Sequence, residues 1–205
     1  MLKDMKLYEF LDELASPSPA PGGGSASALL CSVGAALVSM VCHLTIGKKG
    51  YEESEVELRK VLEESESLRK RAEGLIDEDT KAYNGVVAAY KIPKENQQRS
   101  AMIQTALKDA CSTPLEVAKI GIRIMELSKI AAFKGNVNSI SDAGVATLAA
   151  GGGVKGAVFN IKVNLKSMKD VKFGESIRVK AHEIEEMERT LSEEVKGIVS
   201  FKLAN

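Results

Sequence analysis

The segment from residue 135 to 146, GNVNSISDAGVA, gathers amide, hydroxyl and carboxylate side chains at the expected start of an apolar helix. Ser139 and Asp142 have the spacing of an N-terminal capping box, which is the purely structural interpretation. A cap needs one or two such groups, whereas this segment has five. If the apolar helix buries Asp142, its carboxylate can act as a general base or acid. Asp142 is therefore the first candidate for acid–base chemistry.

A glycine-rich segment stands directly before the first apolar helix. Its residues are Pro21, Gly22, Gly23, Gly24 and Ser25. Glycines let backbone amides approach a ligand, and a helix start adds unpaired N–H groups and a dipole that favours an anion. The segment has no P-loop lysine and follows no strand, so it is neither a Walker nor a Rossmann motif. Two interpretations stay open, an anion site and a tight turn that permits close helix packing.

Two smaller groups of residues could take part in binding or catalysis. Asp79 and Tyr83 are four residues apart and share one face of a long amphipathic helix, although a solvated aspartate is the commoner case. Lys48 and Lys49 follow the first apolar helix, where cations suit the helix dipole or could bind a ligand.

Cysteine and histidine residues predict no metal site. Cys31, Cys42 and Cys111 show no CxxC or Cys/His spacing and are expected to be small, reduced core residues. His43 lies within the apolar helix, where a lone histidine is usually structural, and His182 is expected at the surface. The role of His43 stays open.

Helical periodicity dominates the chain, and no segment combines the alternation and turn signals of a β-sheet. We predict one all-α domain over residues 1–205, a helical bundle with two buried apolar helices and no significant sheet. The apolar helices are expected at 25–46 and 138–166, the second interrupted or bent at Gly151–Gly153. Amphipathic helices are expected at 5–14, 51–90, 95–129 and 175–201, with a loop at 16–21, a kink near Ser112 caused by Pro114, and the last helix outside.

Composition limits the partners of the chain. The 205 residues carry 28 basic and 28 acidic side chains, so no long-range field would attract nucleic acid or an anionic membrane. Residues 25–47 contain His43 but carry no formal charge, and they are long enough to cross a bilayer. Their Ala, Ser and Gly content instead favours a buried central helix. The polar N-terminus does not look like a secretory signal, so we expect a cytoplasmic protein.

Five motifs in order resemble the cyclodeaminase/cyclohydrolase family: PxPGGGSASA, LTxGKKxYE, DxxAY, NxNSxSDAGVA and NIKVNL. The resemblance covers nearly the whole chain. It implies an all-helical homodimer that binds a tetrahydrofolate and needs no metal or tightly held organic cofactor. Without a fused formiminotransferase segment, it favours a methenyltetrahydrofolate cyclohydrolase, which hydrates 5,10-methenyltetrahydrofolate to 10-formyltetrahydrofolate. Formiminotetrahydrofolate cyclodeaminase, which releases ammonia, is the alternative; a non-catalytic folate-binding dimer and an anion or nucleotide binder are more remote.

The resemblance also suggests roles for the polar residues. The methenyl carbon bridges two nitrogens in a cationic amidinium, which a carboxylate stabilises while accepting a proton from water. Asp142 is expected to be this carboxylate, with Asp79 and Tyr83 as a second carboxylate and proton relay or as contacts to the pterin. The side chains expected to hold the water and the developing hydroxyl are Asn136, Asn138 and Ser141. Expected contacts of the anionic polyglutamate tail are the amides of Gly22 to Gly24 and the side chains of Lys48, Lys49 and Lys134.

Overall fold

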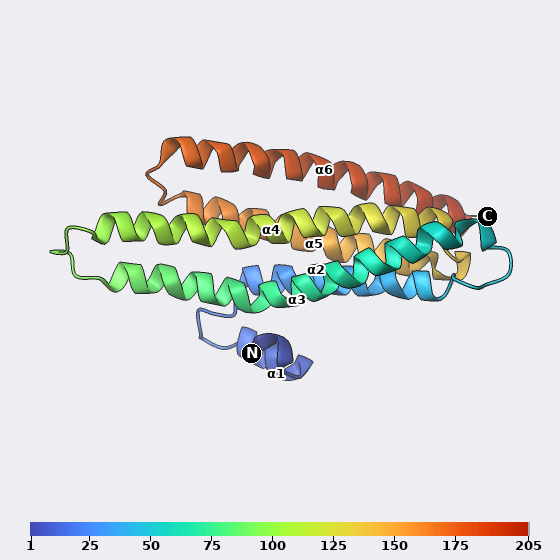
Figure 1. The fold of residues 1–205 in the computed structure, drawn as a ribbon, viewed down its shortest axis with the longest axis horizontal. Coiled ribbons are helices and arrows are strands. Elements are labelled where there is room, and N and C mark those ends of the chain that lie inside the picture. Colours follow the sequence, from blue (N-terminus) through green and yellow to red (C-terminus); the bar gives the residue numbers. More distant parts are fainter. Residues whose placement is uncertain (205) are drawn as a thin grey trace.

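The computed structural model describes residues 1–204, which form six α-helices, three single-turn 3₁₀ helices and no strand (Figure 1). The α-helices are α1 (Leu7–Leu14), α2 (Gly23–His43), α3 (Glu55–Lys91), α4 (Arg99–Lys134), α5 (Ile140–Leu165) and α6 (Val171–Ala204). The 3₁₀ helices are η1 (Leu2–Asp4), η2 (Glu52–Ser54) and η3 (Val137–Ser139). The predicted all-α class is confirmed.

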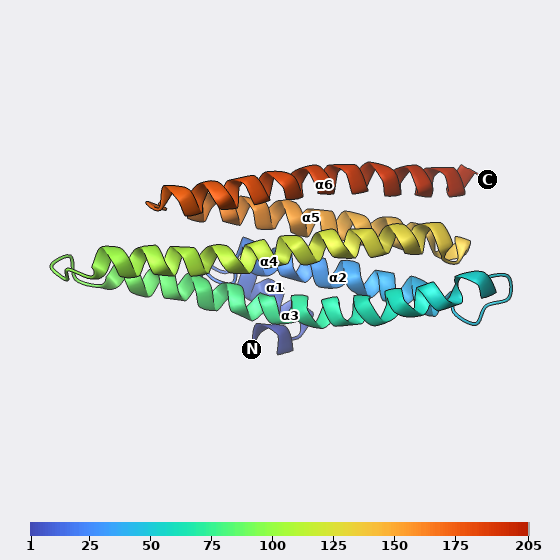
Figure 2. The same cartoon turned by 45° about the horizontal axis from the view of Figure 1, so that its top comes forward.

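The five long helices lie side by side with their axes roughly aligned (Figures 1 and 2). Helices α2 to α5 form the body of the bundle, and α6 packs on α4 and α5. Helices α3 and α4 continue beyond the start of α2 and project as a hairpin at one end (Figure 1). The short helix α1 lies below α2 and α3 in that view and buries Phe10.

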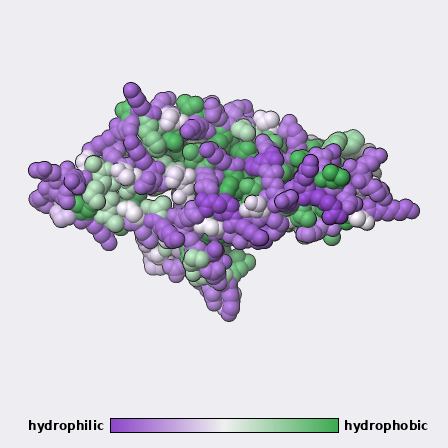
Figure 3. Space-filling model, in the orientation of Figure 1, coloured by the Kyte–Doolittle hydropathy of each residue, from purple (hydrophilic) through white to green (hydrophobic). Residues whose placement is uncertain are grey.

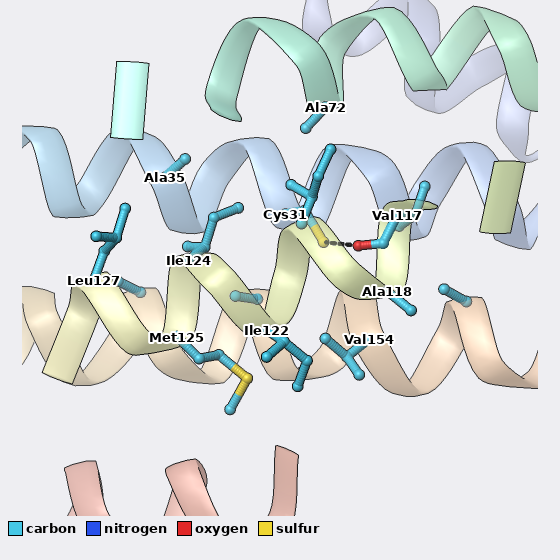
Figure 4. Packing of buried hydrophobic residues seen from close by; sticks show 14 of the residues in the cluster. Cys31, Ala35, Ala72, Val117, Ala118, Ile122, Ile124, Met125, Leu127 and Val154 are labelled. Atoms are coloured by element: carbon cyan, nitrogen blue, oxygen red, sulfur yellow. Dashed lines mark hydrogen bonds between the residues drawn. The ribbon is translucent and has the colours of Figure 1, made fainter. Parts of the chain in front are cut away.

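Helix α2 belongs to the core, as its apolar composition predicts. Its most apolar window satisfies the length and hydropathy of a membrane span, yet 61% of that window is buried inside the fold. Figure 4 shows Cys31 and Ala35 of α2 among apolar side chains of the neighbouring helices, with the Cys31 thiol donating to the Val117 carbonyl at 3.7 Å. Burial raises the pKa of Cys31 to about 12, which suits an inert core thiol.

Glycines allow α2 and α5 to approach closely. A Cβ on Gly34 would lie 2.9 Å from the Ala146 carbonyl oxygen, and one on Gly153 would lie 2.5 Å from the Cys31 sulfur. The predicted interruption at Gly151–Gly153 is therefore wrong: α5 is continuous, because these glycines serve helix packing and do not end the helix. The contacts also show that the two helices run antiparallel.

Pro114 does not interrupt its helix. Helix α4 is continuous from residue 99 to 134, although Pro114 cannot donate to the carbonyl of Ala110 one turn earlier. The side-chain amide of Asn164, on α5, donates to that carbonyl at 2.8 Å. The hydrogen bond lost to proline is thus replaced from a neighbouring helix, which local sequence could not reveal.

Other boundaries differ from the predictions in ways that matter for the site. Helix α2 begins at Gly23, so two glycines belong to its first turn. His43 ends this helix and is exposed, contrary to its predicted core position. Helix α3 is one continuous helix, and α6, predicted as an outer charged helix, buries Ile177 and Val195 among other side chains.

Candidate active site at the start of helix α2

The carboxylate of Asp79, on α3, lies against the first turn of α2. Its Oδ2 is 3.0 Å from Ser25 Oγ, which is also 3.0 Å from the Ile76 carbonyl oxygen. A Cβ on Gly24 would lie 2.0 Å from Asp79 Oδ1 and 2.4 Å from its Cγ. Only glycine at position 24 leaves room for this carboxylate. The glycine segment and the DxxAY motif, 54 residues apart, therefore meet in space.

The surroundings of Asp79 change its acidity. Burial raises the pKa of this carboxyl group, and this effect exceeds the opposing one of hydrogen bonds from the side chain and backbone amide of Ser25. A carboxyl group with a raised pKa exchanges its proton nearer to neutral pH, as general acid–base catalysis requires. Asp79 is thus better suited to catalysis than a solvated helix residue.

The first turn of α2 has no side-chain cap. Gly22 is the N-cap residue and contributes only backbone. The N–H groups of Gly23 and Gly24 have no acceptor within the helix and carry the positive end of its dipole. Pro21 before them is buried, which fixes the chain entering the helix. The turn can therefore bind an anionic group beside the Asp79 carboxylate.

One further side chain lies near this turn, and another follows Asp79 on α3. A Cβ on Gly23 would be 3.5 Å from Asn160 Nδ2, which donates to the Gly156 carbonyl at 2.8 Å. Tyr83, one turn after Asp79, is 39% exposed. Sequence reasoning included Tyr83 but assigned no role to Asn160, although the NIKVNL motif contains it. We call the site formed by Pro21 to Ser25, Asp79, Tyr83 and Asn160 the glycine end.

The remaining predicted residues gather at the other end of α2 and α5. We call Lys48, Lys49, Lys134, Asn136, Asn138, Ser141 and Asp142 the asparagine end. Asn136 is buried, and its backbone N–H donates to Thr45 Oγ1 at 2.8 Å while its side-chain amide donates to the Leu44 carbonyl at 3.1 Å. Its side-chain oxygen accepts from the backbone N–H of Asn138 at 3.1 Å. The bonds to Thr45 and Leu44 tie the segment before α5 to the end of α2, so Asn136 has a structural role.

The charged members of the asparagine end have mixed surroundings. Lys134 pairs with Glu57, while Lys48 and Lys49 are exposed in the turn after α2. Ser141 is exposed and Asp142 is half-buried in the first turn of α5, where a carboxylate suits the helix dipole.

The two ends are far apart within one chain. Asp142 and Asn160 are eighteen residues apart on α5, which corresponds to about 27 Å along the helix. One chain therefore does not bring the glycine segment and Asp142 together. The catalytic role of each residue stays a prediction.

A metal site and a second cavity are the other possibilities to consider, and neither involves the predicted residues. Within residues 1–204, no three His, Cys, Asp or Glu side chains are grouped to hold a metal ion. A cavity of about 450 Å³ between α5 and α6 contains the buried carboxylate of Glu188. Ser192 donates to Glu188 at 2.7 Å and Lys155 pairs with it at 3.2 Å, so both of its oxygens have partners.

The fold and the glycine end define a helical-bundle protein with a carboxylate of raised pKa at an uncapped helix start. The family model described as formiminotransferase-cyclodeaminase matches residues 6–183. The chain belongs to this family, which confirms the resemblance seen in its motifs.

Individual relatives divide between two activities. A methenyltetrahydrofolate cyclohydrolase of Methylorubrum extorquens is 49% identical over 170 residues, which cover 81% of this chain and 82% of that protein. The formimidoyltransferase-cyclodeaminase of Rattus norvegicus is 34% identical over 86% of this chain but only 34% of its own length. The crystal structure of formiminotetrahydrofolate cyclodeaminase from Thermotoga maritima has a TM-score of 0.92 and 28% identity, and covers 99% of this chain and 100% of that one.

Proposed function

We propose that this protein is a methenyltetrahydrofolate cyclohydrolase, which converts 5,10-methenyltetrahydrofolate and water to 10-formyltetrahydrofolate. The 49% identity to the Methylorubrum enzyme, over most of both chains, supports this reaction. The observation that carries the proposal is the half-buried Asp79 carboxylate, with its raised pKa, beside the uncapped start of α2.

In the proposed mechanism, Asp79 is the general base in place of our sequence-based choice, Asp142. Water attacks the electron-poor methenyl carbon, and Asp79 accepts a proton as the new C–O bond forms. The hydroxyl of the tetrahedral intermediate then loses its proton to give the formyl C=O, while the bond from carbon to N5 breaks and N5 takes up a proton. The reaction releases one proton overall, because the substrate is cationic and the formyl product is neutral at that carbon.

Other groups of the glycine end would position the substrate. The free N–H groups of Gly23 and Gly24 would bind an anionic or carbonyl oxygen of the folate. Tyr83 and Asn160, on α3 and α5, would contact the pterin on opposite sides of Asp79. No tightly held cofactor or metal is part of this proposal.

Formiminotetrahydrofolate cyclodeaminase activity is the second candidate. The Thermotoga maritima structure, which matches nearly the whole chain, favours it. In that reaction the protonated form of Asp79 would donate to the leaving ammonia. A non-catalytic folate-binding protein is the third, more remote candidate.

One experiment separates these functions. The purified protein is assayed with 5,10-methenyltetrahydrofolate, by loss of the methenyl absorbance, and with 5-formiminotetrahydrofolate, by release of ammonia. We expect turnover of the methenyl compound, and a loss of about 10²-fold or more in kcat for Asp79→Asn. Folate binding without turnover of either compound would leave only the binding protein, and full activity of Asp79→Asn would remove Asp79 from the mechanism.

We also propose that the protein is a homodimer and acts in the cytoplasm. Reduced, buried thiols at all three cysteine positions are compatible with a reducing compartment. Support for the dimer comes from large apolar side chains that are exposed on α5, among them Leu148 and Phe159.

A further inference from the structure

Another cavity, with a volume of about 450 Å³, opens near the glycine end, between the end of α5 and the first half of α6. The two helices lie side by side there in both views of the fold (Figures 1 and 2). Leu165 and Ala181 in its wall are buried, whereas its other side chains are ionisable. We call it the basic cleft, and these side chains are Lys162, Lys166, Arg178, His182 and Glu185.

Positive charge is concentrated around the basic cleft. The whole chain is neutral, but residues 162–182 contain six lysine and arginine residues against only two acidic ones, Asp170 and Glu175, which gives a net charge of +4. Hydropathy alone does not single out such a region, because hydrophilic side chains with apolar areas between them are spread over the face shown in Figure 3. A local excess of cations attracts anions even where the chain as a whole does not.

Three side chains of the cleft are free to meet a ligand. Within residues 1–204, neither the Lys166 ammonium nor the His182 ring makes a hydrogen bond or an ion pair. Arg178 has one exposed ion pair, with Glu175 at 3.4 Å. Such a pair contributes little and leaves most of the five guanidinium N–H groups without an acceptor.

The fold itself explains only part of this cluster. Lys162 lies in the last turn of α5 and Lys166 is its C-cap residue, where cations suit the negative end of the helix dipole. Arg178 and His182 lie two to three turns inside α6, where the dipole has no such effect. Cations from two helices that converge on one cavity are suited to a ligand with several negative charges.

The basic cleft lies within reach of a folate bound at the glycine end. Lys166 follows Asn160 by six residues, which corresponds to about 9 Å along α5 and a third of a turn around it. In a tetrahydrofolate, a benzoyl group and its amide separate the one-carbon unit from the first glutamate, which is a comparable length. Lys48 and Lys49, which the sequence predicts as contacts of this tail, lie at the asparagine end of the same chain.

We propose that the basic cleft binds the carboxylates of the folate's glutamate tail, and that it makes the protein prefer a polyglutamylated substrate to the monoglutamate. Each added glutamate contributes a carboxylate, so a triglutamate has enough charge to pair with Lys166 and Arg178 together. His182 would donate a hydrogen bond to another oxygen of the tail. This inference rests on the proposed function, because it takes a folate as the substrate.

Steady-state kinetics with the mono- and triglutamate forms of 5,10-methenyltetrahydrofolate test the preference. We expect KM of the wild type to be about tenfold lower for the triglutamate, from two exposed ion pairs. In the double variant Lys166→Gln/Arg178→Gln this ratio should fall to about twofold or less, with the loss in KM for the triglutamate and not in kcat. Lys172→Gln/Lys180→Gln is the matched control, because it removes the same charge from the same segment outside the cleft and should keep the ratio.

Several results of these assays would overturn the inference. One is a wild type that does not prefer the triglutamate, and another is a cleft variant that keeps the preference. Equal losses in both double variants would show that general charge, and not the cleft, attracts the tail. If Lys48→Gln/Lys49→Gln loses the preference while the cleft variant keeps it, the tail binds at the asparagine end instead.

Binding of 5-formyltetrahydrofolate, measured by calorimetry, separates this inference from the proposed function. If the protein turns over neither one-carbon compound, the proposed function fails, but tighter binding of the triglutamate that Lys166→Gln/Arg178→Gln abolishes would still support the cleft. Citrate, at matched ionic strength, tests for a site that takes free anions. It should compete more strongly with the triglutamate than with the monoglutamate, and equal competition would overturn the assignment to the tail.

Glu185 offers a test by gain of affinity. Its carboxylate pairs with Lys162 at 2.6 Å inside the cleft and would repel the tail. Glu185→Gln should release Lys162 and bind the triglutamate about 2–5-fold more tightly than wild type. Glu183→Gln, at an exposed glutamate on α6 that does not line the cleft, is the control and should bind as wild type does. Equal binding by the two variants would contradict the proposal.

Discussion

Gly24→Ala tests whether the Asp79 carboxylate occupies the place that the structure gives it. The new Cβ would lie 2.0 Å from Oδ1, 2.4 Å from Cγ and 2.7 Å from Oδ2 of Asp79, whereas folded proteins avoid Cβ contacts below 3.0 Å. The carboxylate must therefore move by at least about 1 Å, a misplacement that can cost about 10²-fold in rate. Forcing a methyl group into a filled space costs about 1–3 kcal/mol, offset in part by the better helix propensity of alanine.

The assay measures both consequences. We expect kcat for the methenyl compound to fall about 10²-fold in Gly24→Ala, with a free energy of unfolding up to about 2 kcal/mol lower than in wild type. Gly197→Ala is the matched control: a Cβ there meets nothing within 4 Å, so the same change on α6 should keep full activity and gain up to about 1 kcal/mol.

A double variant separates the clash from other effects of the alanine. Asp79→Ala removes the atoms that the new Cβ would strike, so Gly24→Ala should cost less stability in that background than in wild type, without recovery of activity. If Gly24→Ala instead keeps wild-type kcat and the two substitutions are additive in stability, the carboxylate does not lie against residue 24 and our reading of the site fails.

Three further predictions concern stability. Burial raises the pKa of Asp79 above the ordinary value, so its carboxylate opposes folding as pH rises through the folded-state pKa. Asp79→Asn should therefore raise the melting temperature at pH 8, and this gain should shrink towards pH 4 in thermal melts. A gain that grows in acid would contradict the direction of the pKa shift. Asn164→Ala should lower the free energy of unfolding in denaturant by about 1–3 kcal/mol, because it leaves the Ala110 carbonyl unpaired. The loss should be clearly smaller in a Pro114→Ala background, where the backbone N–H of residue 114 can replace the bond. Equal losses in both backgrounds would refute this account. Gly153→Ala should cost about 1–3 kcal/mol because its Cβ would lie 2.5 Å from a core sulfur, and an unchanged midpoint of unfolding would show that α2 and α5 are not packed so closely.

The sequence predicts the helices of this fold better than it predicts their ends. Periodic apolar residues mark each helix, but Gly151–Gly153 and Pro114 imitate local breaks. Their effects are decided by neighbours: a sulfur and carbonyl of α2 that need the space at Gly153, and the Asn164 amide that replaces the bond lost at Pro114. Such partners are distant in sequence, so a local pattern contains no trace of them.

The same limit applies to the site. The glycine segment correctly indicates a helix start, and spacing places Asp79 and Tyr83 on one face, but nothing in one sequence pairs residue 24 with residue 79. The density of polar residues around Asp142 is visible in sequence, whereas the burial that changes the acidity of Asp79 depends on how α2 and α3 pack.

The two polar clusters differ in what they do for stability, and this difference supports the glycine end as the place of chemistry. At the asparagine end, Asn136 makes two hydrogen bonds to the end of α2 and accepts a third from the Asn138 amide, so its polar groups are explained by the fold. At the glycine end, an uncapped first turn contains Gly23 and Gly24, and the half-buried Asp79 carboxylate loses solvation at a cost in free energy that an asparagine would avoid. A fold gains nothing from these choices, whereas a site that must bind an anion and move a proton needs all of them.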